Sequence, residues 1–338
     1  MAAGTARSRR GLRAPGVAVV AGILLISLAA CRSGSGVAQG AAQGAAQPGA
    51  TQSVAAAVPA GPASAQSSSL PASASAETPV TRGTPGKPRA TVPAHADPFT
   101  AAAAAAYVAQ RNGTVLAAVY DLRTGQTWRL GDGPPEDEAS VVKLDILQTL
   151  LAEWPGGLPS SEQSLAQRMI ENSDNDAATS LWYAAGGASG LSAYNARVGL
   201  TRTTPSPCVE CAGFPWPGWG LTTTVPADQL TLLRALIEPG PLLTAAARRY
   251  ALSLMENVEP DQDWGVSGGV PAGVTVALKN GWLPLNDADT DWQINSVGWV
   301  SGDGRDYLIA VMSTGNPDEQ YGIDTISELS AMVWSAMA

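Results

Sequence analysis

The sequence predicts an α+β fold in which one antiparallel sheet takes strands from both ends of a globular region. Three observations predict it: the region begins with a helix and two strands, continues as a block of helices, and ends with three strands and a helix. Strands from both ends bury their apolar faces best in a single sheet. The helical block between them is then an inserted lobe.

The first elements follow from alanine content and apolar periodicity. Residues 99–110 are rich in alanine and lack helix breakers, which predicts a helix. Residues 114–130 hold two apolar runs around a Thr-Gly turn, which predicts a hairpin. From Ser140 to Leu151 apolar residues recur with helical spacing, so the lobe is expected to begin there.

The same periodicities predict the remaining elements. Helices are expected at residues 162–170, from about 176, and at 225–237, 242–257 and 318–337. Strands are expected at residues 274–278, 293–300 and 307–313.

The amino terminus is predicted to be a lipoprotein signal peptide, residues 1–31. Arginines precede an apolar run, residues 17–28, which is shorter than the roughly 20 residues of a membrane-spanning helix. The run ends in Leu-Ala-Ala-Cys31, which resembles a bacterial lipobox with a lipidated cysteine. We expect export and anchoring to the outer face of the cell membrane, by the Sec or the twin-arginine route. An ordinary signal peptide or an uncleaved anchor is the alternative.

A disordered tether is predicted to follow at residues 32–98. Small and polar residues dominate it and no aromatic residue occurs there, so it cannot form a core. Residues 99–338 contain all ten tryptophans and suffice for one domain.

The domain is strongly acidic, with 12 lysines and arginines against 27 aspartates and glutamates. This balance argues against nucleic acid as a partner. A site built around its two lysines would be a local positive spot suited to a substrate carboxylate. General solubility explains the acidity equally well.

Cys208 and Cys211 form a Cys-Val-Glu-Cys pair among several prolines. The strand-to-helix context of a thioredoxin-like redox site is absent, and a zinc site lacks further ligands. A loop-stapling disulfide is therefore favoured outside the cytoplasm. We expect no metal and no cofactor.

The candidate chemistry uses serine and lysine, because the one histidine, His95, falls in the tether. Ser140 and Lys143 lie one helical turn apart, which places a hydroxyl and an amine on one face. Burial would make the amine a base. A capping serine beside a surface lysine is the alternative. Asp145 is expected to face away from Lys143, exposed to solvent.

Two further motifs follow in order. The run from Ser173 to Asn175 lies between two helices, where a hydroxyl and an amide can point into a cleft. Capping residues would explain the same run. Lys279-Asn280-Gly281 ends an apolar strand, and the glycine would let a substrate backbone lie close. Each motif alone is weak, whereas the three in this order are specific.

Together the motifs resemble those of the penicillin-recognising serine enzymes, the class A β-lactamases and D,D-peptidases, which carry S-x-x-K, S-D-N and K-T-G. The resemblance covers about residues 100–338. It implies that Ser140 is the acylated nucleophile, Lys143 its base and Ser173 a relay to the leaving nitrogen. Asn175 would hold the substrate amide, and Lys279 would help to bind the substrate carboxylate.

The third motif departs from the family pattern. Asn280 replaces the hydroxyl residue of K-T-G, and bulky Trp282 follows Gly281 where the family prefers a small residue. These three residues are still expected to bind substrate, in a narrower cleft. The backbone N–H groups of Ser140 and Trp282 would form the oxyanion hole.

Two other departures concern the walls of the cleft and deacylation. Only 33 positions separate Ser140 from Ser173, so a helix-loop wall is expected to be missing and the cleft to be more open there. The family's Glu-x-x-Leu-Asn signature is absent. Glu210 lies near its position and is a candidate catalytic base, with a solvated loop glutamate as the alternative. Trp216 and Trp219 are expected to pack under an irregular loop rather than to floor a groove.

The sequence therefore predicts an exported, lipid-anchored, monomeric serine hydrolase. Its substrates would be β-lactams or D-alanyl peptides of peptidoglycan. Slow deacylation would make it resemble a penicillin-binding protein. A catalytically impaired lipoprotein that binds the cell wall or a partner is the alternative. A sugar- or protein-binding module with accidental motifs is a third.

Overall fold

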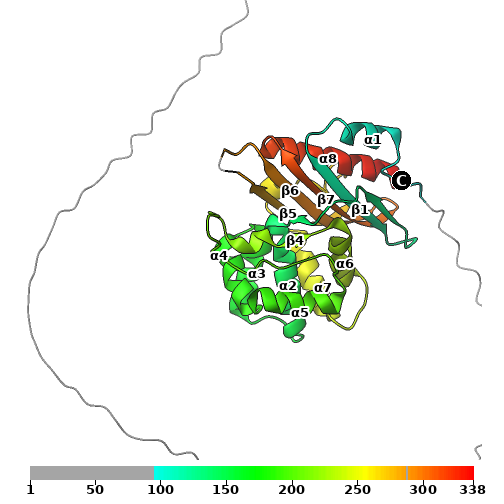
Figure 1. The fold of residues 1–338 in the computed structure, drawn as a ribbon. Coiled ribbons are helices and arrows are strands. Elements are labelled where there is room, and N and C mark those ends of the chain that lie inside the picture. Colours follow the sequence, from blue (N-terminus) through cyan, green and yellow to red (C-terminus); the bar gives the residue numbers. More distant parts are fainter. Residues whose placement is uncertain (1–94, 287) are drawn as a thin grey trace, which may run out of the picture. The chain divides into compact units, whose positions relative to one another are not determined.

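The computed structural model describes residues 95–286 and 288–338, all of which belong to one compact unit (Figure 1). The predicted signal peptide with Cys31, and the tether as far as residue 94, lie outside the described residues. In the described ranges no helix has both the length and the apolar character of a membrane span.

One five-stranded antiparallel sheet, in the order β2-β1-β7-β6-β5, forms the centre of the domain. Its strands are β1 (Thr114–Asp121), β2 (Thr127–Leu130), β5 (Thr275–Pro284), β6 (Trp292–Gly302) and β7 (Arg305–Asn316). The pairing of β1 with β7 joins the two ends of the domain, which confirms the predicted fold class. β5 runs well past the predicted end at residue 278, so the third motif lies inside a strand.

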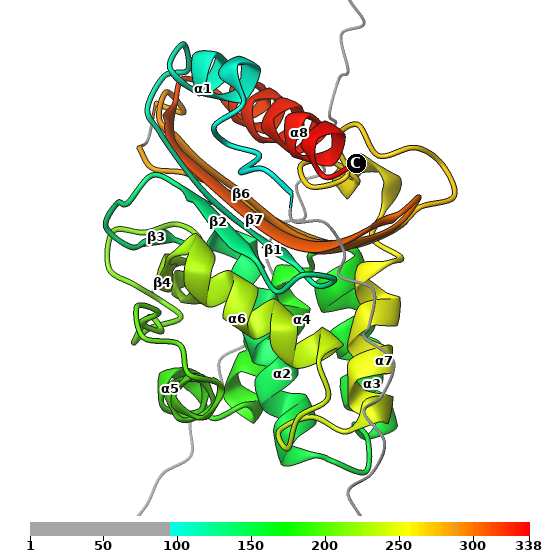
Figure 2. The ribbon, with the colours of Figure 1, turned by 90° about the vertical axis from the view of Figure 1, so that its right-hand side faces the viewer.

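Two helices cover one face of the sheet (Figure 2). They are α1 (Ala102–Val108), shorter than predicted, and α8 (Glu319–Ala336). Buried side chains of the sheet, such as Leu278 and Ile309, form one apolar cluster with Ile326 of α8. The carboxy-terminal helix is therefore part of the core of this layer.

The helical lobe packs against the opposite face (Figures 1 and 2). Its helices are α2 (Val142–Glu153), α3 (Ser160–Glu171), α4 (Asn175–Ala184), α5 (Gly187–Val198), α6 (Pro226–Ile237) and α7 (Ala245–Met255). Its short elements are the 3₁₀ turns η1 (Ala139–Val141), η2 (Gly218–Leu221) and η3 (Pro260–Gln262), and the paired strands β3 (Glu136–Asp137) and β4 (Thr223–Thr224).

Helix α5 is an element that the sequence does not predict. Its glycines lower helix propensity and break the apolar pattern. Gly186 enters the helix with φ of 84°. A Cβ at Gly190 would lie 1.7 Å from the carbonyl oxygen of Ala185, so the tight connection from α4 requires a glycine inside α5. The glycines thus obscure the helical pattern in the sequence, and the same glycines allow the tight connection from α4 to α5.

The expectation that Asp145 is exposed is wrong. Asp145 is completely buried, because α2 runs through the middle of the lobe and α5 packs beside it. Its Oδ2 accepts a hydrogen bond of 2.8 Å from Asn195 Nδ2. Burial raises the pKa of Asp145 to about 7. Helical spacing correctly turns Asp145 away from Lys143, but it does not reveal that another helix covers that side.

Candidate active site

Ser140 lies in the 3₁₀ turn that leads into α2, and neighbouring strands hold this turn in place. Ala139 adopts a left-handed conformation with φ of 50°, which is costly for a residue with a side chain. The preceding Glu138 is fixed on both sides: its N–H donates to Thr222 O at 2.7 Å, and its carbonyl accepts from Asn295 Nδ2 at 3.0 Å. The nucleophile candidate therefore stands on a constrained turn.

Lys143 is completely buried and connects the first two motifs. Its Nζ donates to Ser140 Oγ at 2.9 Å, to Ser173 Oγ at 2.9 Å and to Asn175 Oδ1 at 2.8 Å. Burial, and then the positive charge of Lys279, lower the pKa of Lys143 well below its usual value. A neutral amine beside the Ser140 hydroxyl is the arrangement that a serine nucleophile needs without histidine.

The turn between α3 and α4 points Ser173 toward the lysines. Ser173 has φ of 55°, in the left-handed region. Capping is done by its neighbour, because Asp174 Oδ1 accepts from Ala177 N at 2.8 Å and Asp174 also pairs with Arg168 at 2.7 Å. Since Asp174 closes the helix end, the hydroxyl of Ser173 is left for the site.

Lys279 approaches the same hydroxyl from the sheet. Its Nζ donates to Ser173 Oγ at 3.1 Å and to the carbonyl of Asn280 at 3.0 Å. The side chain has no exposed surface, and burial lowers its pKa to about 7. Ser173 Oγ therefore lies between two amines, one from each layer of the domain.

Alternation along β5 separates the residues of the third motif. Ala277 packs in the cluster of the lobe and Leu278 in the cluster of α8, so Lys279 and Asn280 also face opposite sides. The Asn280 amide donates to the carbonyls of Gln262 at 2.7 Å and Trp264 at 3.1 Å. The structure commits this amide to the loop behind the strand rather than to the pocket of Ser140.

Gly281 is required because β5 closely approaches the 3₁₀ turn Ala139–Val141, here called the nucleophile turn because it carries Ser140. A Cβ at this position would lie 2.6 Å from Glu138 O and 2.8 Å from Ser140 N. The sequence alone suggests that this glycine lets a substrate backbone lie close. In the structure it makes room for the protein's own backbone, which holds Trp282 and Ser140 near each other.

A pocket of about 280 Å³ opens at Ser140, and four of the residues that line it are tryptophans. It is lined by Ala139, Ser140, Ser173, Asn175, Trp216, Pro217, Trp219, Gly220, Trp282, Leu283, Pro284, Trp292 and Glu319. Lys143, Lys279 and Asn280 do not line it. The buried lysines therefore act on the pocket through the hydroxyls that they contact.

Trp216 and Trp219 line this pocket, which corrects the expectation that they only pack under a loop. Trp219 is almost fully buried, and its Nε1 donates to Thr179 Oγ1 at 3.1 Å. The centroid of its ring lies 5.0 Å from Lys143 Nζ. An indole face thus covers the amine on the side of the loop, while Trp216 is half-exposed at the rim.

Glu210 is exposed in this loop and does not line the pocket. It lies between Cys208 and Cys211, which form a disulfide with 5.5 Å between their Cα atoms. A Cβ at Gly218 would lie 2.0 Å from Cys211 Sγ, so the disulfide packs directly on the start of η2. The cysteine pair thereby helps to position the turn that carries Trp219.

Other candidates lie outside the pocket. His95 contacts Arg123 and lies 3.8 Å from Asp121, at the end of β1. Within residues 95–286 and 288–338 no group of three metal-ligating side chains is arranged to hold an ion. Trp292 and Glu319 line the pocket but carry no sequence signal, because they follow Ser140 by more than 150 positions and belong to no motif.

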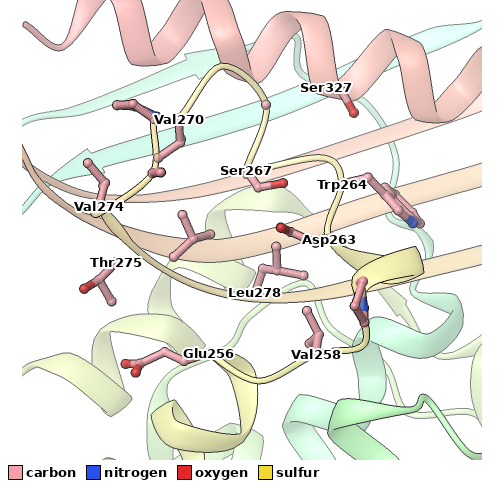
Figure 3. A pocket seen from close by; sticks show the side chains of 15 residues that line it. Glu256, Val258, Asp263, Trp264, Ser267, Val270, Val274, Thr275, Leu278 and Ser327 are labelled. Atoms are coloured by element: carbon pink, nitrogen blue, oxygen red, sulfur yellow. The ribbon is translucent and has the colours of Figure 1, made fainter.

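A larger hollow, of about 830 Å³, lies elsewhere, beside the start of β5 (Figure 3). Glu256, Asp263, Thr275 and Ser327 are among its lining residues. Figure 3 shows them spread around the loop that connects α7 to β5. No residue of the three motifs lines this hollow, so the chemistry is assigned to the smaller pocket.

Known proteins resemble this chain in sequence and in fold. "Putative lipoprotein LppW" of Mycobacterium tuberculosis is 27% identical over 230 residues, which make up 64% of this chain and 68% of that protein. A class A beta-lactamase from Bacteroides cellulosilyticus has a similar fold, with 18% identity, a TM-score of 0.59, and coverage of 68% of this chain and 94% of that one. PBP-A is similar with 22% identity, a TM-score of 0.56, and coverage of 67% and 91%.

The family is shown by a match that covers more than half of the chain. The model of the Beta-lactamase enzyme family matches residues 151–337. This range contains Ser173, Asn175 and Lys279 and begins after Ser140 and Lys143. The chain therefore belongs to the Beta-lactamase enzyme family, within the penicillin-recognising serine enzymes that its motifs predict.

Proposed function

We propose that this protein is a serine hydrolase that opens β-lactams or cleaves D-alanyl peptides of peptidoglycan. The reaction would pass through an acyl-enzyme, an ester at Ser140. One observation carries the proposal. The buried Lys143 amine donates at the same time to Ser140 Oγ and Ser173 Oγ. This places a base beside the nucleophile and a route for its proton beside the position of the leaving nitrogen.

In the acylation step, the neutral amine of Lys143 takes the proton of the Ser140 hydroxyl. The Oγ attacks the carbonyl carbon of the amide, and the carbonyl oxygen becomes an oxyanion. The backbone N–H groups of Ser140 and Trp282 would stabilise this oxyanion, a contribution of about 3 kcal/mol per donor in related chemistry. The close packing of Gly281 on the nucleophile turn supports this pairing.

The tetrahedral intermediate collapses when the leaving nitrogen is protonated. The proton moves from Lys143 to Ser173 Oγ and from there to the nitrogen, and the carbon–nitrogen bond breaks. Lys279 donates to the same hydroxyl and orients it. Asn175 would hold the substrate amide, and Lys279 would attract a substrate carboxylate through Ser173.

Hydrolysis of the ester needs a water molecule and a base, and we propose that this step is slow. Glu319 is the one carboxylate among the described residues that line the pocket, and an indole face covers Lys143. Glu210 stays a candidate base through motion of its loop. The protein would then accumulate acyl-enzyme as penicillin-binding proteins do.

Mass spectrometry of the purified domain with penicillin G, sampled over time, tests the proposal. We expect a covalent adduct with the mass of the intact penicillin, which decays slowly. The variant Ser140→Ala should form none, whereas the matched variant Ser180→Ala removes a hydroxyl from the exposed side of α4 and should react normally. Absence of an adduct in the wild-type protein at millimolar penicillin would contradict the proposal. Glu210→Gln should lengthen the adduct's lifetime if Glu210 deacylates.

A second function, a module that binds the cell wall without turnover, is favoured by the Asn280 amide, which is turned away from the pocket. In that case Ser140→Ala would leave a cellular phenotype intact that deletion of the domain abolishes. The catalytic proposal predicts that both changes abolish it.

We also propose that Cys31 carries a lipid that anchors the protein outside the cell. The similarity to a protein named as a lipoprotein supports this proposal. Cys31→Ala should move the protein from the membrane fraction into the medium or the soluble fraction. Unchanged sedimentation with membranes would contradict lipidation at this cysteine.

A further inference from the structure

One end of the pocket is aromatic and carries a single carboxylate. Strand β5 begins its contact with the site at Lys279, beside Ser173, and runs on to Pro284. At about 3.3 Å per residue, Pro284 lies roughly 16 Å farther along the strand. There the pocket is lined by Trp282, Pro284, Trp292 and Glu319.

Glu319 is held in place by the packing of α8. Asp318 caps the helix, since its Oδ1 accepts from Tyr321 N at 2.7 Å. A Cβ at Gly322 would lie 2.3 Å from Ile294 Cγ1, so the first turn of α8 lies tightly on β6. Glu319 is partly buried, and of the described residues none hydrogen-bonds or ion-pairs with its carboxylate. The position is fixed while the charge is unmatched.

The charge of this end suits a cation. No arginine, lysine or histidine of the described ranges lines the pocket. An ammonium group would be attracted both by Glu319 and by the aromatic side chain of Trp292, which line this end of the pocket. A carboxylate in the same place would be repelled. The acidic surplus of residues 99–338 acts in the same direction.

We propose that this end, the Glu319 subsite (Trp282, Pro284, Trp292 and Glu319), binds an ammonium group carried by the acyl side of the substrate. The inference rests on the proposed function, because acylation of Ser140 defines the acyl side. Ser173 and Lys279 mark the side of the leaving nitrogen, and the Glu319 subsite lies away from them along β5. A side chain of several methylenes would pack on the apolar residues of this end and place its terminal amine at Glu319.

Three penicillins of similar size test the subsite: 6-aminopenicillanic acid acylated with 5-aminopentanoic, hexanoic or adipic acid. Their side chains end in an ammonium, a methyl and a carboxylate group. We expect the rate of Ser140 acylation to fall in this order, with about a fivefold advantage of the amine over the methyl compound. Glu319→Gln should remove most of the advantage, and Glu319→Lys should reverse the order.

Glu328→Gln is the matched control, because it removes the same charge from an exposed position of α8. It should leave the order unchanged. Equal rates for the three compounds in the wild-type protein would overturn the inference. So would an order that Glu319→Gln does not alter.

A binding measurement separates this inference from the acylation chemistry. Nα-acetyl-lysine amide and Nα-acetyl-norleucine amide are titrated into Ser140→Ala, and tryptophan fluorescence is followed. We expect the lysine derivative to bind about five times more tightly, and Glu319→Gln to abolish the difference. If this preference holds but no penicillin labels Ser140, the proposed function fails and the subsite stands. If penicillins label Ser140 without the preference, the subsite fails and the proposed function stands.

Discussion

The buried lysines of the site and the buried Glu138 next to it differ in how their polar atoms are satisfied. Lys143 and Lys279 each have hydrogen-bond partners in the pocket wall. Glu138, two residues before Ser140, is equally buried, but none of the described residues donates to either carboxyl oxygen. Burial, and then the charges of Asp145 and Asp228, raise the pKa of Glu138 well above its usual value.

The difference supports the proposal that an amine, rather than a nearby carboxyl, is the base. Burial disfavours the charged form of both kinds of group, so it shifts the amine toward the unprotonated form, which can accept a proton, and the carboxyl toward the protonated form, which cannot. Glu138 is close to Ser140 in the sequence, yet it does not line the pocket, and burial raises its pKa, which favours the protonated form. A loss of the Lys143 amine should therefore not be rescued by a neighbour.

The largest effect is expected from Lys143→Met, which keeps the length of the side chain and removes the base. The rate of acylation by penicillin G should fall by about a hundredfold to ten-thousandfold. Lys279→Met is the matched variant, because Lys279 also contacts Ser173 but has no contact with Ser140. Stopped-flow or mass-spectrometric acylation rates should fall at least about ten times further in Lys143→Met. Equal losses would mean that the two lysines share one role.

Gly281→Ala should give the next largest effect. The added Cβ would lie 2.6 Å from Glu138 O and must push β5 away from the nucleophile turn. Because the Trp282 N–H would move with the strand, acylation should slow by about a hundredfold, as when one oxyanion donor is lost. A control is Gly240→Ala, at a position with no neighbour near its Cβ and without a left-handed backbone. Acylation rates and thermal unfolding are measured for both. An unchanged acylation rate in Gly281→Ala would exclude Trp282 from the oxyanion hole.

The three motifs predict which residues meet at the centre of the candidate site, because hydroxyl and amine side chains in this order are typical of one kind of serine chemistry. The order of Ser140, Ser173 and Lys279 predicts that three distant segments meet, and the structure places them within hydrogen-bond distance. Their surroundings are less predictable. The pattern of α2 alone predicts that Asp145 is exposed, because it contains no information about α5, which covers that side. Glu319 has the sequence of an ordinary helix start, and its position in the pocket follows only from the packing of α8 on β6.

Orientation within the third motif is equally hidden in the sequence. Asn280 reads as a substitute for a hydroxyl residue, but whether its amide reaches substrate depends on strand alternation and on the loop behind β5. The carbonyls of Gln262 and Trp264 compete for that amide and bind it in the structure. The sequence identifies the Asn280 amide as a hydrogen-bond donor, whereas its acceptor depends on the tertiary structure.

The smallest effect concerns Glu136, a second buried carboxyl near Ser140 in the sequence, and appears as a dependence of stability on pH. Glu136 is buried, and burial raises its pKa to about 7, from 4.5. The folded protein therefore binds more protons than the unfolded chain between pH 4.5 and 7, and stability is lost as the pH rises through this window. Glu136→Gln cannot ionise and keeps an acceptor for Gln293. Relative to the wild type, this variant should be more stable at pH 8 than at pH 5 by up to about 3 kcal/mol.

Urea unfolding at the two pH values measures this difference directly. Glu328→Gln, on the exposed side of α8, should change stability by less than about 0.5 kcal/mol at both. If Glu136→Gln behaves like Glu328→Gln, Glu136 is ionised in the folded protein at neutral pH. Glu136 would then be a source of negative charge close to Ser140 in the sequence, and the contrast between buried amines and protonated buried carboxyls would no longer describe this site.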